Sequence, residues 1–420
     1  MSLGSIFCNE EAVMVAVKKT GTRTRGLVCF VSAVLLMFVT GCSGSKSAEK
    51  TKEILIGSIH PMSGGMAYEG NQIIDAQKMA IDEINAAGGI KSLGGVTLKL
   101  ITGDSQGKAD IAATEAQRLI QQGALVLTGT FSSSNTQTAT QEAEKAKTPF
   151  VITVAASNAL MIRNFKYSFR IQPNTDTFTQ DFIDYLTKIK TDDIKTMVVI
   201  HENSLYGTSI YDYLKAHNTT GAELLDEIAY ASTTTSLSSE VTRIQSLNPD
   251  LLVCIGYNQD QTLLYKEILQ RNLTFKGIIG IANGGFSDPA FIRNFGTSAD
   301  GVMDINYRWN PKSQLAQNML ANFKTKYNAD MSPHAIFGYT SVYVIADALE
   351  RAASTNKDKI RDALAATSLS EHVLPQGVIA FDAKGENKNA AAVLTQIQNG
   401  QSAVVFPKEY ANADLIFPLK

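Results

Sequence analysis

The sequence is poor in the residues that carry redox, metal and covalent chemistry. Among 420 residues there are only four cysteines and five histidines. Cys8, Cys29 and Cys42 all lie near the N-terminus, which leaves Cys254 as the one thiol in the body of the chain. No disulfide can form within that body. Because Cys254 lies in the apolar run 251–255, we expect a buried, inert thiol rather than a nucleophile.

The familiar catalytic and metal-binding motifs are also missing. The chain has no G-x-S-x-G elbow, no phosphate-binding P-loop, no G-x-G-x-x-G and no H-E-x-x-H. The histidines are dispersed without the spacing of metal ligands, and we expect each to be a structural or surface residue: His60, His201, His217, His334 and His372. The sequence therefore predicts no metal, no cofactor and no catalytic residue.

A large charge of one sign is absent as well. The chain has 38 basic and 40 acidic residues, a net charge of -2, and no basic run in its body. Nucleic acid is therefore not an expected partner. With 44% hydrophobic residues over this length, the chain can bury a sizeable core and is expected to form two domains.

The longest apolar stretch lies near the N-terminus, at 27–39, and is short for a membrane span. It follows a basic segment and ends at Val39-Thr40-Gly41-Cys42, which resembles a bacterial lipobox. We therefore predict a lipoprotein signal peptide at 1–41, lipidation of Cys42 and a flexible tether at 42–52. The exported protein would be anchored by lipid at the periplasmic or extracellular face of a membrane. An uncleaved membrane anchor is the alternative.

Apolar runs and helical periodicity alternate along the rest of the chain. The first part predicts strands at 54–59, 96–101, 124–127 and 150–154, with helices at 70–87, 108–121 and 135–146 between them. The rhythm restarts with strands at 195–200, 223–229 and 251–255 and helices at 208–217, 239–247 and 259–270. Such βαβ repetition predicts an α/β fold of two Rossmann-like lobes with parallel sheets.

The C-terminal part is more mixed. It predicts a strand at 302–307, helices at 312–326, 335–353 and 357–366, and a further strand at 378–381. A hairpin over 394–405, turning on Asn399-Gly400, is expected to close the chain.

Two loops rich in small and hydroxyl-bearing residues follow neighbouring predicted strands. The first is Gly129-Thr130-Phe131-Ser132-Ser133-Ser134-Asn135 and the second is Ala155-Ala156-Ser157-Asn158. A loop that opens a helix offers free backbone N–H groups and the positive end of the helix dipole, which suit a carboxylate or phosphate. A plain N-cap explains the first loop alone equally well. Both loops are expected at one edge of a sheet, where α/β folds bind ligands.

At these residues the chain resembles the leucine/isoleucine/valine-binding proteins of type I periplasmic binding architecture. The segments that carry the resemblance are 56–64, 82–90 (DEINAAGGI), 129–137 (GTFSSSNTQ), 152–157, Tyr206-Gly207, 338–350 (GYTSVYVIADALE) and Phe381-Asp382. It implies a solute-binding protein of an ABC importer, without enzymatic activity, which closes on an amino acid or related small carboxylate. It also implies a permease partner and a monomer. The implied lobes are 53–173 plus 304–376 and 174–303 plus 377–420, joined by a multi-strand hinge.

The resemblance also implies roles for particular residues. Ser132, Ser133 and Ser157 would hold the carboxylate of the ligand, and the carbonyl of Ala155 would help to hold its ammonium. Tyr206 from the other lobe would cover the ligand, with Tyr257 nearby.

Three departures put the ligand in doubt. The glutamate that family members place in the loop at 280–285 is missing, and Asp176, expected in a loop near the hinge, could substitute for it. The aromatic of the first loop is shifted to Tyr68, with Glu69 at the matching place, and the disulfide of some members has no cysteines here.

Two other functions stay open at this point. A receptor of the same fold could feed a signalling system instead of a transporter. A serine hydrolase would need a base within hydrogen-bond reach of Ser132, Ser133 or Ser157, and His60 is the one histidine expected at that edge.

Overall fold

The computed structural model describes residues 53–419. The predicted signal peptide, Cys42 and the predicted tether lie outside the described residues. Over residues 53–419, no helix combines the length and the apolar character needed to cross a bilayer.

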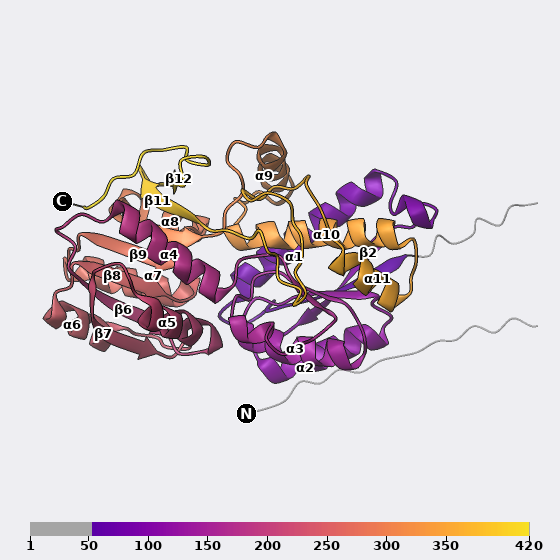
Figure 1. The fold of residues 1–420 in the computed structure, drawn as a ribbon, viewed down its shortest axis with the longest axis horizontal. Helices are drawn as coiled ribbons and strands as arrows, with labels where there is room; N and C mark the ends of the chain where they lie inside the picture. The colour runs from indigo at the N-terminus through magenta and orange to yellow at the C-terminus, as the bar shows by residue number, and fades with distance from the viewer. Residues whose placement is uncertain (1–52, 420) are drawn as a thin grey trace, which may run out of the picture. The chain divides into compact units, whose positions relative to one another are not determined.

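The first sheet has five parallel strands in the order β2-β1-β3-β4-β5. The strands are β1 (Ile54–His60), β2 (Leu98–Asp104), β3 (Val126–Gly129), β4 (Phe150–Ile152) and β5 (Ser168–Arg170). Helices α2 (Ala109–Gln121) and α3 (Ser133–Lys145) lie on one face, and α1 (Ala67–Ala86) and α10 (Pro333–Ala352) lie on the other (Figure 1). This is the predicted βαβ pattern.

The second sheet has seven strands in the order β12-β11-β10-β9-β8-β6-β7. They are β6 (Thr196–Glu202), β7 (Glu223–Tyr230), β8 (Leu251–Ile255), β9 (Gly277–Ile281), β10 (Met303–Asn306), β11 (Val393–Gln398) and β12 (Gln401–Phe406). β6 to β10 are parallel, whereas β11 runs antiparallel to both β10 and β12.

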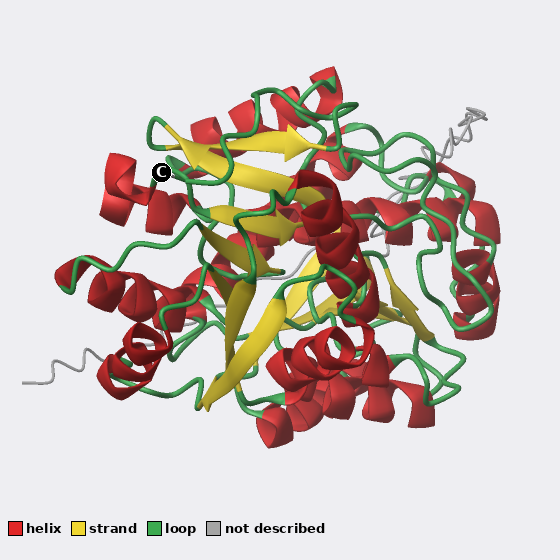
Figure 2. Ribbon diagram, turned by 60° about the vertical axis from the view of Figure 1, so that its left-hand side comes forward, coloured by secondary structure: helices red, strands yellow, loops and turns green. Residues whose placement is uncertain are grey.

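Helices cover both faces of this second sheet (Figure 2). They are α4 (Thr175–Ile189), α5 (Leu205–His217), α6 (Ser238–Leu247), α7 (Asn258–Gln270) and α8 (Pro289–Phe295). The side chains of strand β8 explain why helices are needed on both faces of this sheet. Leu251, Val253 and Ile255 belong to one hydrophobic cluster, and Leu252 and Cys254 belong to another. Successive strand side chains point to opposite faces, so a continuous apolar run needs helices on both sides. The buried, free Cys254 is confirmed.

The predicted hairpin at the end of the chain is also confirmed. β11 and β12 pair antiparallel on either side of Asn399 and Gly400, whose φ angles are 52° and 67°. Two successive residues with positive φ form the tight turn that matches the twist of the strands. Asn and Gly are the residues that adopt this conformation most readily.

Two predictions for local structure are wrong. Residues 378–381 form no strand and make only isolated bridges, between Ile379 and Leu369 and between Phe381 and Asn387. Asp176 is not in a loop, because it lies in the first turn of α4. Asn174 caps this helix by accepting from the N–H of Thr177 at 2.8 Å. The polar start of the segment hid its helical pattern.

The remaining helices connect the two sheets along the chain. α9 (Gln314–Tyr327) follows β10 of the second sheet, α10 packs on α1 of the first, and α11 (Lys357–Ala365) follows α10. The chain then touches β5 of the first sheet, where Glu386 bridges to Arg170, before it enters β11.

Candidate functional site

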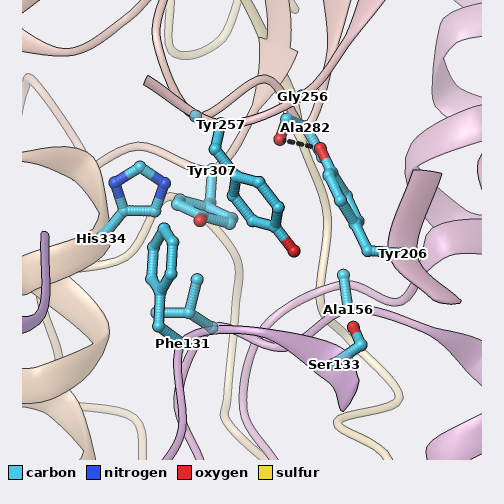
Figure 3. A pocket seen from close by; sticks show the side chains of 11 residues that line it. Phe131, Ser133, Ala156, Tyr206, Gly256, Tyr257, Ala282, Tyr307 and His334 are labelled. Atoms are coloured by element: carbon cyan, nitrogen blue, oxygen red, sulfur yellow. Dashed lines mark hydrogen bonds between the residues drawn. The ribbon is translucent and has the colours of Figure 1, made fainter. Parts of the chain in front are cut away.

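A small cavity lies where the carboxyl ends of strands from both sheets meet (Figure 3). Its lining residues follow strands of the first sheet or the second, or begin α5 and α10: Phe131, Ser133, Val154, Ala156, Tyr206, Gly256, Tyr257, Ala282, Gly284, Tyr307 and His334. Ligands in open α/β sheets bind at this edge.

Aromatic rings form most of the wall. The ring of Phe131 lies 5.6 Å from that of Tyr257 and 5.1 Å from that of His334, measured between centroids. Tyr206 lies 5.5 Å from Tyr257, and Tyr307 lies 5.6 Å from His334. Five rings therefore make a continuous wall, which suits a flat or apolar ligand.

The side chains that line the cavity carry no charge at neutral pH. None of the lining residues is an Asp, Glu, Lys or Arg. Burial lowers the pKa of His334 to about 3, so its ring is neutral. Burial also raises the pKa values of Tyr206, Tyr257 and Tyr307 well above the ordinary tyrosine value. Any ionic group of a ligand must therefore be stabilised by dipoles.

The N-terminus of α3 supplies such a dipole. Ser132 is the N-cap, and its Oγ accepts from the N–H of Asn135 at 3.4 Å. Among residues 53–419, the N–H groups of Ser133 and Ser134 have no acceptor. The Oγ of Ser133 accepts from the N–H of Ser157 at 3.2 Å and keeps its own proton free to donate. These donors and the helix dipole can hold an anion.

Ser157 is engaged between the two halves of the molecule. Its Oγ lies 2.9 Å from the Oγ of Ser209 on α5. Ser209 donates its own proton to the carbonyl of Leu205 at 2.6 Å, so the hydroxyl of Ser157 must be the donor to Ser209. In this arrangement Ser157 has no proton left for a ligand carboxylate.

The carbonyl of Ala155 is engaged inside the protein. It accepts from Nε2 of Gln172 at 2.8 Å and from Arg170 at 3.3 Å. Arg170 also donates to the carbonyl of Ser157 at 2.7 Å and forms a buried ion pair with Glu386. Arg170 therefore links the second candidate loop, residues 155–158, to Glu386 in the segment that precedes β11. Ala156, not Ala155, lines the cavity.

The two tyrosines expected at the site both lie in its wall. The hydroxyl of Tyr206 donates to the carbonyls of Ala282 at 2.5 Å and Ile281 at 3.3 Å, which fixes its ring across the cavity. In Figure 3 the hydroxyl of Tyr257 points toward the side where Ser133 and Ala156 lie.

Asp176 and Tyr68 do not line the cavity. A carboxylate oxygen of Asp176 accepts from Asn158 at 2.6 Å, and burial raises its pKa. The hydroxyl of Tyr68 is buried without a hydrogen-bond partner in the described part of the chain. Burial, followed by the nearby charge of Asp288, raises its pKa above the ordinary value.

Sequence reasoning missed Phe131, Tyr307 and His334 as wall residues. Phe131 lies within the first candidate loop, and Tyr307 ends a predicted strand, so the rule that ligands bind at strand ends could have found both. His334 begins α10, and Nδ1 of its ring has no partner within residues 53–419. Nothing in its sequence context marks it.

The histidine considered for a hydrolase is not paired with a serine. His60 ends β1 and is fully buried, and neither ring nitrogen has a hydrogen-bond partner among the described residues. Burial lowers its pKa to about 3. A base that activates a serine must reach its hydroxyl, and His60 makes no such contact with Ser132, Ser133 or Ser157.

Comparison with known proteins agrees with this architecture. The profile of the periplasmic binding protein family matches residues 53–402. A Leu/Ile/Val-binding protein homolog 8 of Brucella abortus is 28% identical over 380 residues, which cover 87% of this chain and 93% of that protein. A homolog 7 of Brucella suis is 26% identical over 393 residues, covering 89% and 96%.

Solved structures share the fold. The branched-chain amino acid transporter substrate-binding protein LivJ of Streptococcus pneumoniae, in complex with isoleucine, has a TM-score of 0.75 at 22% identity, covering 87% of this chain and all (100%) of LivJ. A solute-binding protein of an ABC transporter from R. palustris, in complex with benzoate, has a TM-score of 0.74 at 19% identity, covering 88% and 100%. The predicted type I periplasmic binding fold is confirmed.

The family implies an extracytoplasmic location, and the solved structures described above are of solute-binding proteins rather than enzymes. The chain belongs to the periplasmic binding protein family, and the relatives to which it is similar include Leu/Ile/Val-binding protein homologs.

Proposed function

We propose that this chain is the solute-binding protein of an ABC importer and captures a small carboxylate with an apolar body. The observation that carries the proposal is the neutral aromatic cavity, which is lined by Ser133 at the N-terminus of α3, where the N–H groups of Ser133 and Ser134 have no acceptor among residues 53–419. The relatives named above support it, since one structure holds isoleucine and another holds benzoate, both of them carboxylates.

Capture would proceed by closure of two lobes around the ligand. The cavity is lined by residues that follow strands of both sheets, so a ligand there touches both halves. A ligand favours the closed state only as far as it gains contacts there that the open state lacks. Tyr206 and Tyr257 would supply those contacts from the second sheet. The lobe limits given above, and delivery to a permease, belong to this proposal.

The lipid anchor at Cys42 is also part of the proposal. Its test is the mass of the mature protein from cells: an acylated N-terminal cysteine is expected in the native chain, and export without membrane attachment is expected for Cys42→Ala. A native chain that retains residues 1–41 would contradict the anchor.

The test of ligand capture is a thermal-shift panel of acids and their neutral amides, such as benzoate with benzamide and leucine with leucinamide. A ligand present at about a thousand times its Kd adds about 4 kcal/mol of stability. Acids should therefore raise the melting temperature and amides should not. Ser133→Ala should weaken binding of an acid about tenfold or more, whereas Ser246→Ala, at an exposed site on α6, should not. If no acid stabilises the protein, the proposal is wrong.

A further inference from the structure

The cavity offers an anion site but no matching site for an ammonium group. Its lining residues include no carboxylate. The glutamate expected at 280–285 is absent, and that loop contributes Ala282 and Gly284 to the wall. The carbonyl oxygen of Ala282 accepts from Tyr206.

The backbone acceptor expected beside the anion site is also in use. The carbonyl of Ala155 has two lone pairs, and its donors are Gln172 at 2.8 Å and Arg170 at 3.3 Å. The neighbouring carbonyl of Ser157 accepts from Arg170 at 2.7 Å. Both oxygens are thus directed into the protein, toward a buried guanidinium.

Carboxylates near the cavity are engaged elsewhere or lie outside its wall. Glu202 accepts from the N–H groups of Ser204 and Gly207. Asp304 accepts from Ser287 and from Nδ2 of Asn306. Both carboxylates therefore already accept hydrogen bonds from donors within the protein.

Several buried acceptors have no donor among the described residues, among them Nδ1 of His334, Oε2 of Glu69 and Oε1 of Gln172. His334 lines the cavity, whereas Glu69 and Gln172 do not, and none of the lining residues is a carboxylate. An amino acid could still bind through these groups, and the experiment below tests Glu69 and Gln172.

Resting on the proposed function, we infer that the ligand is a monocarboxylic acid whose flat or apolar body carries no α-amino group. An ammonium buried in this cavity would lose its water without gaining a carboxylate partner, and a buried unpaired charge is costly. An acid that lacks the amine keeps the contacts to the N-terminus of α3 and loses nothing.

The experiment is titration calorimetry with two matched pairs of ligands. 4-Methylpentanoate differs from leucine, and 3-phenylpropanoate from phenylalanine, only by the α-amino group. In each pair the acid without the amine should bind the purified protein about tenfold tighter or more. Equal or tighter binding of leucine or phenylalanine would overturn this inference and leave the proposed function standing. Binding of none of the four would contradict both.

Two variants identify the groups responsible. Gln172→Leu removes one donor to the carbonyl of Ala155, and the preference for the acid without an amine should narrow. An unchanged preference in a folded Gln172→Leu protein would overturn the role of that carbonyl. Glu69→Gln should leave the ratio within each pair unchanged. If it selectively weakened the amino acids, Glu69 would be their ammonium partner and the inference would fail.

Discussion

The buried ion pair between Arg170 and Glu386 provides a prediction about both stability and binding. The side chain of Arg170 is fully buried and that of Glu386 is 14% exposed. Replacing Arg170 by Met removes the cation that pairs with Glu386, the donor to the carbonyl of Ser157 and one of the two donors to the carbonyl of Ala155. Breaking a buried pair by removing one partner costs about 3–5 kcal/mol, so the free energy of unfolding should fall by that amount.

The same change should make the second candidate loop, residues 155–158, less rigid. Because Arg170 is a donor to the carbonyls of Ala155 and Ser157, its loss should also lower the affinity for an acid that binds at Ser133. Urea unfolding measures the first effect and calorimetry measures the second.

A second substitution separates the pair from general damage to packing. In the double variant Arg170→Met, Glu386→Gln, the uncompensated charge is gone, and part of the lost stability should return. A cost below about 1 kcal/mol for Arg170→Met, which is typical of exposed pairs, would refute the reasoning. So would a double variant that is no more stable than Arg170→Met alone.

Three further predictions concern the cavity and its surroundings. Ser209→Ala should remove the hydrogen bond to Ser157 and lower ligand affinity about fivefold in calorimetry, because one hydrogen bond contributes about 1 kcal/mol. Unchanged affinity would mean that this hydrogen bond does not stabilise closure. Tyr206→Ala should weaken ligand binding about thirtyfold or more, whereas Tyr206→Phe, which keeps the ring, should weaken it about fivefold at most. Equal losses of affinity in the two variants would contradict the proposal that the ring covers the ligand. Burial, and after it the charge of Asp288, raises the pKa of Glu69 to about 8 against the opposing effect of a backbone hydrogen bond, and burial raises that of Asp288 to about 7. Both bind protons more tightly when folded, so the free energy of unfolding should fall as pH rises from about 5 to 8, and Glu69→Gln should reduce that slope by about 1 kcal/mol per pH unit; an unaltered slope would refute the assignment.

The arrangement of strands and helices could largely be read from the sequence. Apolar runs such as 251–255, alternating with helical periodicity, predicted the parallel strands, and Asn399-Gly400 predicted the closing hairpin. These signals are local, because each depends on residues close together in the chain. Helix α4 was missed because its first turn is polar and its apolar face becomes clear only from Phe178 onward.

The candidate site was predictable only in part, because contacts between distant segments decide its chemistry. The loops at Ser133 and Ala156 and the rings of Tyr206 and Tyr257 were located from the sequence, and all four residues line one cavity. Which groups remain free to bind a ligand was not predictable. The proton of Ser157 is committed to Ser209, 52 positions away in the chain, and only the folded structure brings these two hydroxyls together.

A crystal structure of the protein with the most tightly bound acid of the panel would test the central claim most directly. The account predicts a carboxylate oxygen about 2.7–3.2 Å from the backbone nitrogen of Ser133 or Ser134, with the body of the acid between the rings of Phe131, Tyr206 and Tyr257. An acid bound outside this cavity, or with its carboxylate turned away from the N-terminus of α3, would contradict it.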